Sequence, residues 1–137
     1  MAPERGYVLG PREGAPGQDD AGVKASRAST GGSLTVIESD TDGGAPRHVH
    51  GREDECFYVL DGTISVECGA DRWEAGPSSF VFLPRGLPHA WDVVGERARV
   101  LIITAPAGLE VFLREFHVAE GAERAEVARR HGIEFLP

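Results

Sequence analysis

Positive charge is scarce in this sequence. Its 14 lysine and arginine residues stand against 22 aspartate and glutamate residues, which gives a formal net charge of −8 at pH 7. Proteins that bind nucleic acid or an anionic membrane surface need a basic face. The charge balance therefore argues against both as partners, and we expect a small-molecule substrate instead.

Long apolar runs and cysteine motifs are also missing. No stretch approaches the roughly 20 apolar residues that a membrane-spanning helix needs, and the segment from Met1 to Arg5 lacks the apolar core of a signal peptide. Cys56 and Cys68 do not have the C-x-x-C spacing of a zinc or redox pair. We expect both thiols to be reduced and packed as small apolar residues. These features predict a cytoplasmic protein.

The length of 137 residues and a hydrophobic content of 41% fit one folded domain. We divide it into an arm (1–30), a β-barrel core (31–104) and a helical tail (105–137). The core contains short apolar runs, each the length of a strand. They are Leu34–Glu38, Cys56–Leu60, Thr63–Cys68, Phe80–Leu83, His89–Val94 and Arg99–Thr104. Many short strands indicate an all-β sandwich or small barrel.

Turn and helix signals complete this outline. The dipeptide Asp61-Gly62 between two runs predicts a hairpin turn. In the arm, Tyr7–Leu9 and Val23–Ala25 are candidate short strands. The tail predicts a helix that starts at Pro106 and a second helix over 123–130 with Gly132 as its C-cap. The first helix has one apolar face, formed by Leu109, Phe112, Leu113 and Phe116.

His48, His50, Glu55 and His89 form the pattern with the most chemical content. His48 and His50 are two residues apart, so on a strand their side chains point to the same face. Glu55 follows after a short turn, and His89 begins a distant run, so both can join them. Three imidazoles and a carboxylate suit a divalent first-row metal and leave positions open for water, substrate or dioxygen. The candidate ions are Fe, Ni, Mn, Cu and Zn.

The same residues resemble the first motif of the cupin superfamily, G-x5-H-x-H-x(3,4)-E-x6-G. His48, His50, Glu55 and Gly62 match it, and Gly43 lies one place closer than the leading glycine of the motif. That glycine shapes a turn and binds no metal.

The second cupin motif, G-x5-P-x-G-x2-H-x3-N, is matched by Pro84, Gly86 and His89. Ser78 stands in place of its first glycine and Val93 in place of its asparagine. The short spacing between the motifs is similar to that of small bacterial single-domain cupins of the quercetin-dioxygenase-like type. The resemblance implies an all-β fold, the cupin jelly-roll β-barrel, followed here by a short C-terminal helical tail.

The resemblance also implies roles for individual residues. Glu55 would be both a metal ligand and a general base that takes a proton from a substrate hydroxyl. Phe57 shares the strand face of Glu55, and Trp91 that of His89, so both are candidates to clamp a flat substrate. The alternative is that these two rings fill the barrel core.

Three functions fit these residues. The first is a mononuclear-metal dioxygenase that acts on a small oxygenated substrate, of an aromatic or enol type. The second is a non-oxidative cyclase or isomerase of secondary metabolism, and the third is a non-catalytic small-molecule-binding protein. The resemblance further implies a homodimer. The strand-forming Tyr7–Leu9 in the arm and the apolar strand face of Cys56, Tyr58 and Leu60 agree with that expectation.

Overall fold

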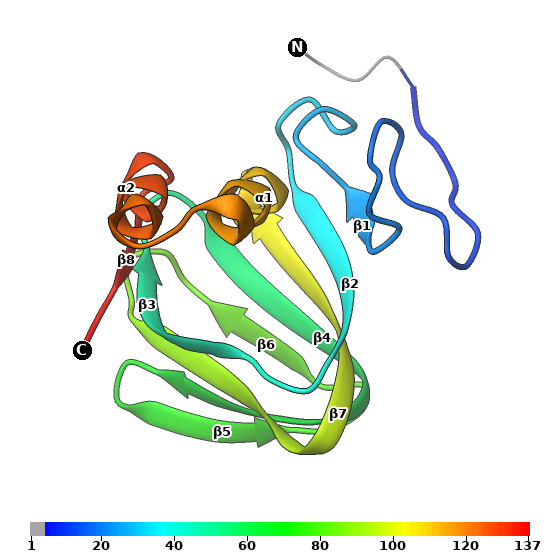
Figure 1. The fold of residues 1–137 in the computed structure, drawn as a ribbon. Coiled ribbons are helices and arrows are strands. Elements are labelled where there is room, and N and C mark those ends of the chain that lie inside the picture. Colours follow the sequence, from blue (N-terminus) through cyan, green and yellow to red (C-terminus); the bar gives the residue numbers. More distant parts are fainter. Residues whose placement is uncertain (1–4) are drawn as a thin grey trace.

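The computed structural model describes residues 5–137, so positions 1–4 of the predicted arm lie outside it. This part of the chain contains one antiparallel sheet of eight strands and two helices (Figure 1). In chain order they are β1 (Val23–Ala25), β2 (Thr35–Thr41), β3 (Ala45–His50), β4 (Asp54–Cys68), β5 (Asp71–Ala75), β6 (Phe80–Leu83), β7 (His89–Ala105), α1 (Leu109–Val118), α2 (Ala122–Arg130) and β8 (Ile133–Phe135). The predicted all-β fold with a short helical tail is confirmed.

The two longest strands, β4 and β7, form the frame of the barrel. They pair from Asp54 opposite Ala105 to Cys68 opposite His89. The first half of β4 also pairs with β6 and its second half with β5, while β7 pairs with β2 and β3. Figure 1 shows the resulting sheet curled on itself. A fully buried apolar core fills the interior, and it includes Phe57, Val59, Ile64, Val66 and Val100.

The hairpin predicted at Asp61-Gly62 is wrong. Strand β4 continues through these residues, and its register with β7 shifts on both sides of Asp61. Gly62 has a φ of +78°, and a Cβ at this position would lie 2.6 Å from the carbonyl oxygen of Arg97. The glycine therefore provides a bend in one long strand, because a bulge needs the same backbone freedom as a tight turn. Strand β7 likewise continues through Gly95, where φ is +90°.

Two further expectations differ from the structure. Tyr7–Leu9 forms no strand; the hydroxyl of Tyr7 donates instead to the carbonyl oxygen of Lys24 at 2.8 Å, beside the confirmed strand β1. Helix α1 begins after Gly108, three residues later than the predicted start. Helix α2 agrees with its predicted range, and Gly132 follows it with a φ of +72°.

The tail returns to the barrel and covers one of its ends. Helices α1 and α2 lie together over that end (Figure 1), and they bury Leu109, Phe112 and Val127 against the core. Strand β8 pairs with β3, with His48 opposite Phe135 and Val49 opposite Glu134. The tail is therefore joined to the strand that carries two of the predicted metal ligands.

Among the described residues, neither helix is long and apolar enough to cross a membrane. The cytoplasmic location expected from the sequence stays a prediction.

The bend at Gly62 gives a first prediction, with Gly95 as its matched control. A Cβ at Gly95 meets nothing within 4 Å, so Gly95→Ala has only the cost of a left-handed backbone, about 1 kcal/mol. A Cβ at Gly62 also collides with the backbone of Arg97 and Ala98, so we expect Gly62→Ala to lower the free energy of unfolding by roughly twice as much or more. Urea unfolding of the two variants measures this difference. If both variants lose the same free energy of unfolding, the backbone of β7 at Arg97 and Ala98 moves away from the new Cβ without cost.

Candidate metal centre

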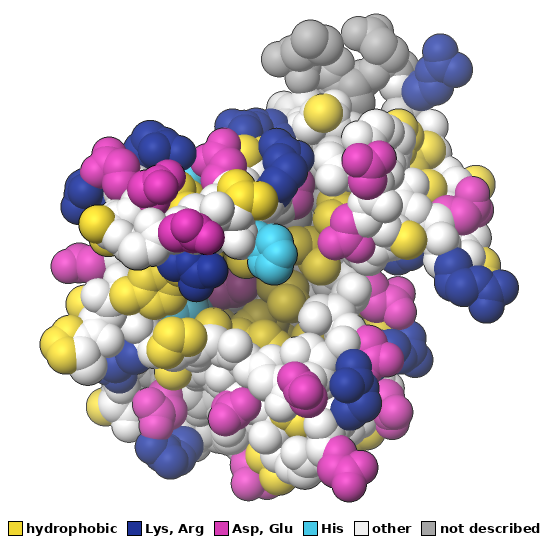
Figure 2. All heavy atoms as spheres, viewed as in Figure 1, with side chains coloured by type: hydrophobic (Ala, Val, Ile, Leu, Met, Phe, Trp, Pro, Cys, Tyr) yellow, Lys and Arg dark blue, Asp and Glu magenta, His cyan; other side chains and the backbone are white. Residues whose placement is uncertain are grey.

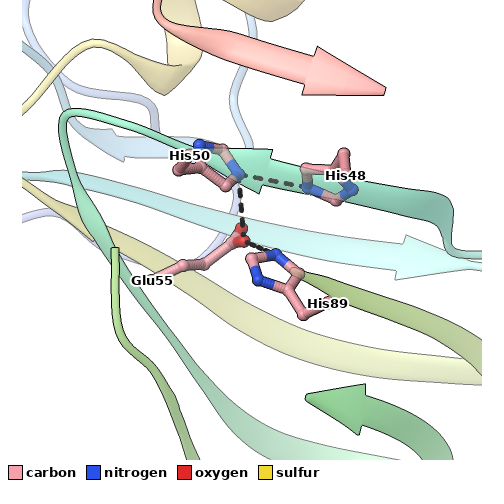
Figure 3. A group of neighbouring side chains, drawn as sticks. All are labelled: His48, His50, Glu55 and His89. Atoms are coloured by element: carbon pink, nitrogen blue, oxygen red, sulfur yellow. Dashed lines mark hydrogen bonds and ion pairs between the residues drawn. The ribbon is translucent and has the colours of Figure 1, made fainter. Parts of the chain in front are cut away.

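The four residues predicted as metal ligands lie together inside the barrel (Figure 3). His48 and His50 point to the same side of β3, as strand alternation requires. His89 begins β7 directly opposite His48, and Glu55 lies near the start of β4. All four side chains are buried, with exposures between 1% for His89 and 6% for His48. Three strands therefore supply one cluster.

The donor atoms converge closely. The Nε2 atoms of His48 and His50 are 3.1 Å apart. Oε1 of Glu55 lies 2.9 Å from Nε2 of His89 and 3.4 Å from Nε2 of His50. Neighbouring ligands that lie about 2.1 Å from one ion are separated by about 3.0–3.4 Å. The separations in the cluster are therefore those of a shared coordination sphere.

Contacts behind the rings fix the orientation of two imidazoles. Nδ1 of His48 donates to the carbonyl oxygen of Pro46 at 2.6 Å, and Nδ1 of His50 donates to Oε1 of Glu53 at 2.5 Å. In each ring Nε2 then faces the cluster as the ligand atom. Such partners are typical of metal-binding histidines, which makes the cluster a good fit for a metal ion.

Glu53 and Asp54 precede Glu55 in the sequence, and the structure gives them different places. Asp54 faces outward and pairs with Arg85 at 3.2 Å, whereas Glu53 is 7% exposed and supports His50. The sequence holds no signal for this role, because the contact depends on how the turn between β3 and β4 folds back.

The electrostatics of the metal-free cluster favour a cation at its centre. Burial lowers the pKa of His48 to about 4, so this ring is neutral at pH 7. Burial alone would raise the pKa of Glu55, but hydrogen bonds from His50 and His89 lower it to about 2. Burial would also lower the pKa of His50, yet the carboxylates of Glu53 and Glu55 raise it to about 9. With Nδ1–H of His50 bonded to Glu53, the proton on Nε2 lies on the side of Glu55, where a divalent ion would bind.

A pocket of about 740 Å³ opens onto the cluster. Its floor includes His48, His50 and Glu55, whereas His89 lies behind them and does not line it. Figure 2 shows this side of the molecule as a hollow with a hydrophobic floor and basic and histidine side chains at its rim. A second cavity of about 610 Å³ lies between the arm and α1 and does not reach the cluster.

The two predicted clamp residues have different places. Trp91 lines the pocket. Phe57 is fully buried and does not line it; its ring packs behind Trp91 with a centroid separation of 5.1 Å. Side chains from the tail form much of the remaining wall, which the sequence did not reveal. They are Leu109, Phe112, Leu113, Phe116, Arg124, Ile133, Phe135 and Leu136.

Comparison with known families identifies the barrel. The Cupin_2 family model, described as a cupin domain, matches residues 35–104, which is just over half of the chain. The chain belongs to the cupin family. The matched segment contains all four residues of the cluster.

A curated relative is an uncharacterized protein of Streptomyces coelicolor, 28% identical over 54 residues. The match covers 39% of this chain and 51% of the relative, so the chain spans about half the length of the curated relative it matches.

Solved structures show the same fold at low sequence identity. KdgF from Halomonas sp. is 20% identical with a TM-score of 0.52, over 58% of this cupin and 76% of KdgF. A variant of oxalate decarboxylase from Bacillus subtilis is 19% identical with a TM-score of 0.55, over 61% and 24% of the two chains. A nucleoside dehydratase, known also from Streptomyces variants with uridine, is 21% identical with a TM-score of 0.50, over 58% and 65%. These likenesses establish the fold only, and the likeness to oxalate decarboxylase is confined to a quarter of that protein.

The contact between Glu53 and His50 predicts an effect on metal binding. Glu53→Gln keeps the size of the side chain but removes the charge that orients His50, so we expect metal affinity to fall about 10–100-fold. Asp54→Asn is the matched control, because Asp54 is the next residue and pairs outward with Arg85. Calorimetric titration with Zn²⁺ compares the two variants. An equal affinity of Glu53→Gln and Asp54→Asn would contradict the positioning role of Glu53.

The raised pKa of His50 predicts proton release when a metal binds. The pKa moves up from 6.5 to about 9, so at pH 7 the metal-free ring is protonated, and an ion at Nε2 must displace that proton. We expect about one proton released per ion at pH 7 and weaker metal binding as pH falls. Calorimetry in buffers with different ionisation enthalpies counts the protons. A binding heat that does not depend on the buffer would contradict this prediction.

Proposed function

We propose that this cupin is a metal-dependent enzyme in which His48, His50, Glu55 and His89 hold one divalent first-row metal. The observation that carries the proposal is the convergence of three buried imidazole nitrogens and one carboxylate oxygen, with His48, His50 and Glu55 lining an open pocket. The ion is Fe, Ni, Mn, Cu or Zn, since imidazole and carboxylate ligands suit all of these. The pocket gives a small molecule direct access to the cluster.

Glu55 is the proposed general base. Its lowered pKa keeps the carboxylate ionised at neutral pH, and it lines the pocket beside His48 and His50. A substrate hydroxyl that enters along the apolar wall would meet this carboxylate within the roughly 2.6–3.2 Å needed for proton transfer. Trp91 would direct a flat substrate toward it. Glu55 would thereby convert a phenol or enol into its anion.

The reaction proposed for that anion is a dioxygenation of a small oxygenated substrate of an aromatic or enol type. A bound metal supplies a Lewis acid that stabilises the anion and, if redox-active, a site where dioxygen can react. A non-oxidative cyclase or isomerase would use the same base and the same cation without oxygen, and a binding protein would use neither. Oxygen uptake by the iron-, nickel-, copper- and zinc-loaded proteins with a panel of phenols and enols separates the three. Oxygen-independent turnover by the zinc form would contradict the dioxygenase and favour the cyclase or isomerase.

The base assignment predicts that Glu55→Gln loses activity far more than it loses metal. The amide keeps the shape of the side chain and one ligand oxygen but cannot accept a proton. We expect metal content to fall modestly and turnover to fall by roughly 10²-fold or more.

His89→Ala is the comparison for that experiment, because it removes a ligand that the pocket does not reach. This variant should lose metal and activity together. Near-normal turnover of metal-loaded Glu55→Gln would leave Glu55 as a ligand only.

We propose that two copies of this cupin pair through the outer face of the sheet. In the strand register, Tyr58 lies between Phe80 on β6 and Leu101 on β7. Cys56 lies between Phe82 on β6 and Ile103 on β7. Paired residues share a face. Phe80 is 62% exposed and Phe82 50% exposed, which is unusual for two phenylalanines on the same face of one strand. A second copy of the same face would cover them.

The pairing predicts that Phe80→Glu combined with Phe82→Glu gives a monomer, because charges on this face cannot be buried against themselves. The control is Trp73→Glu. Trp73 is also exposed, but it pairs with the inward-facing Val66 and so lies on the opposite face of the sheet. Light scattering at micromolar concentration measures both variants. A monomeric unmodified protein would contradict the proposal.

A further inference from the structure

The pocket has a wall of aromatic rings that the barrel does not provide. Phe112 and Phe116 from α1 and Phe135 from β8 line it, as Trp91 does. The ring of Phe116 lies 5.1 Å from that of Phe112 and 5.5 Å from that of Phe135, with interplanar angles of 35° and 30°. Such a wall favours a flat apolar body, since aromatic rings stack or pack edge to face at these separations.

Arg124 brings a positive charge to the same pocket. Its guanidinium lies 5.0 Å from the centre of the Phe116 ring, and its Nε donates to the carbonyl oxygen of Ala119 at 2.9 Å. These two contacts hold the side chain in place and leave its terminal nitrogens without a protein partner among residues 5–137. The charge is therefore oriented before any ligand arrives.

The pairing of the other arginines on α2 makes Arg124 distinctive. Arg129 pairs with Glu126, and Arg130 pairs with Glu115. Within the described residues no carboxylate forms an ion pair with Arg124, although the chain has 22 acidic residues. An unpaired, oriented guanidinium beside an apolar cavity is a site for an anion, and a planar carboxylate matches its geometry.

We propose that the pocket takes a small planar molecule that carries a carboxylate, and that Arg124 binds this carboxylate while the opposite end of the molecule reaches Glu55. Only the contact between the bound molecule and Glu55 rests on the proposed function. The aromatic wall holds the flat body between the two polar ends. The substrate class is therefore a hydroxylated aromatic or enolic acid whose acid group is remote from the reacting hydroxyl.

Two probes that differ only in charge test this assignment: 3,4-dihydroxycinnamate and its neutral carboxamide. Each is titrated by calorimetry into the protein of residues 1–137 loaded with zinc. Zinc is not redox-active and so does not oxidise the probe. We expect the acid to bind about tenfold more tightly than the amide, as a charge-assisted hydrogen bond at a partly exposed site allows. Arg124→Gln should abolish this preference and leave the affinity for the amide unchanged. Arg124→Lys should restore part of it.

Arg129→Gln is the matched control, because Arg129 lies on the same helix outside the pocket; it should keep the full preference. Equal affinity of the unmodified protein for both probes would overturn the proposal. So would an acid that fails to bind at millimolar concentration, or an Arg124→Gln variant that keeps the preference or loses both probes equally. The ratio of the two affinities is also measured without metal. If zinc does not bind, the proposed metal centre fails, while this ratio still decides the role of Arg124.

Discussion

The burial of the Glu55 carboxylate is the constraint on which the rest of this cupin depends. An ionised carboxylate removed from water costs several kcal/mol unless charged or hydrogen-bonding partners replace the water. His50 on β3 and His89 on β7 provide those partners. The curled sheet must therefore bring β3, β4 and β7 together at this point, although β3 and β4 do not pair with each other. Glu53 extends the same requirement outward, since it in turn satisfies His50.

The part of the site that the sequence predicted is the part that follows from local geometry. His48 and His50 share a face because side chains alternate along any strand. Glu55 and His89 could be added because the motif spacing indicated the cupin barrel, which brings their strands together. Glu53 could not be found in this way. Its contact with His50 depends on the path of the turn between β3 and β4, and no periodic pattern records that path.

The fold shows the same division between local and long-range information. Short apolar runs located the strands, but the turn predicted at Gly62 was wrong, because a glycine suits a bend in a strand as well as a tight turn. Strand β4 bends at Gly62 because it pairs with β7 along its full length, and that pairing is a long-range property. The apolar face of α1 was equally visible in the sequence. The surface that it covers was not, because the position of the tail is set by the ladder between β8 and β3.

The docked tail means that the cluster and the pocket wall come from different parts of the chain. Backbone hydrogen bonds hold β8 against β3, and buried apolar side chains such as Leu109, Phe112 and Val127 hold the helices on the core. The cluster lies entirely within residues 35–104, whereas much of the pocket wall comes from residues 109–136. Substitutions in the tail can therefore change the shape and charge of the entrance while every group at the floor keeps its place. The cluster and much of the wall above it thus come from different stretches of this sequence, and each can change without the other.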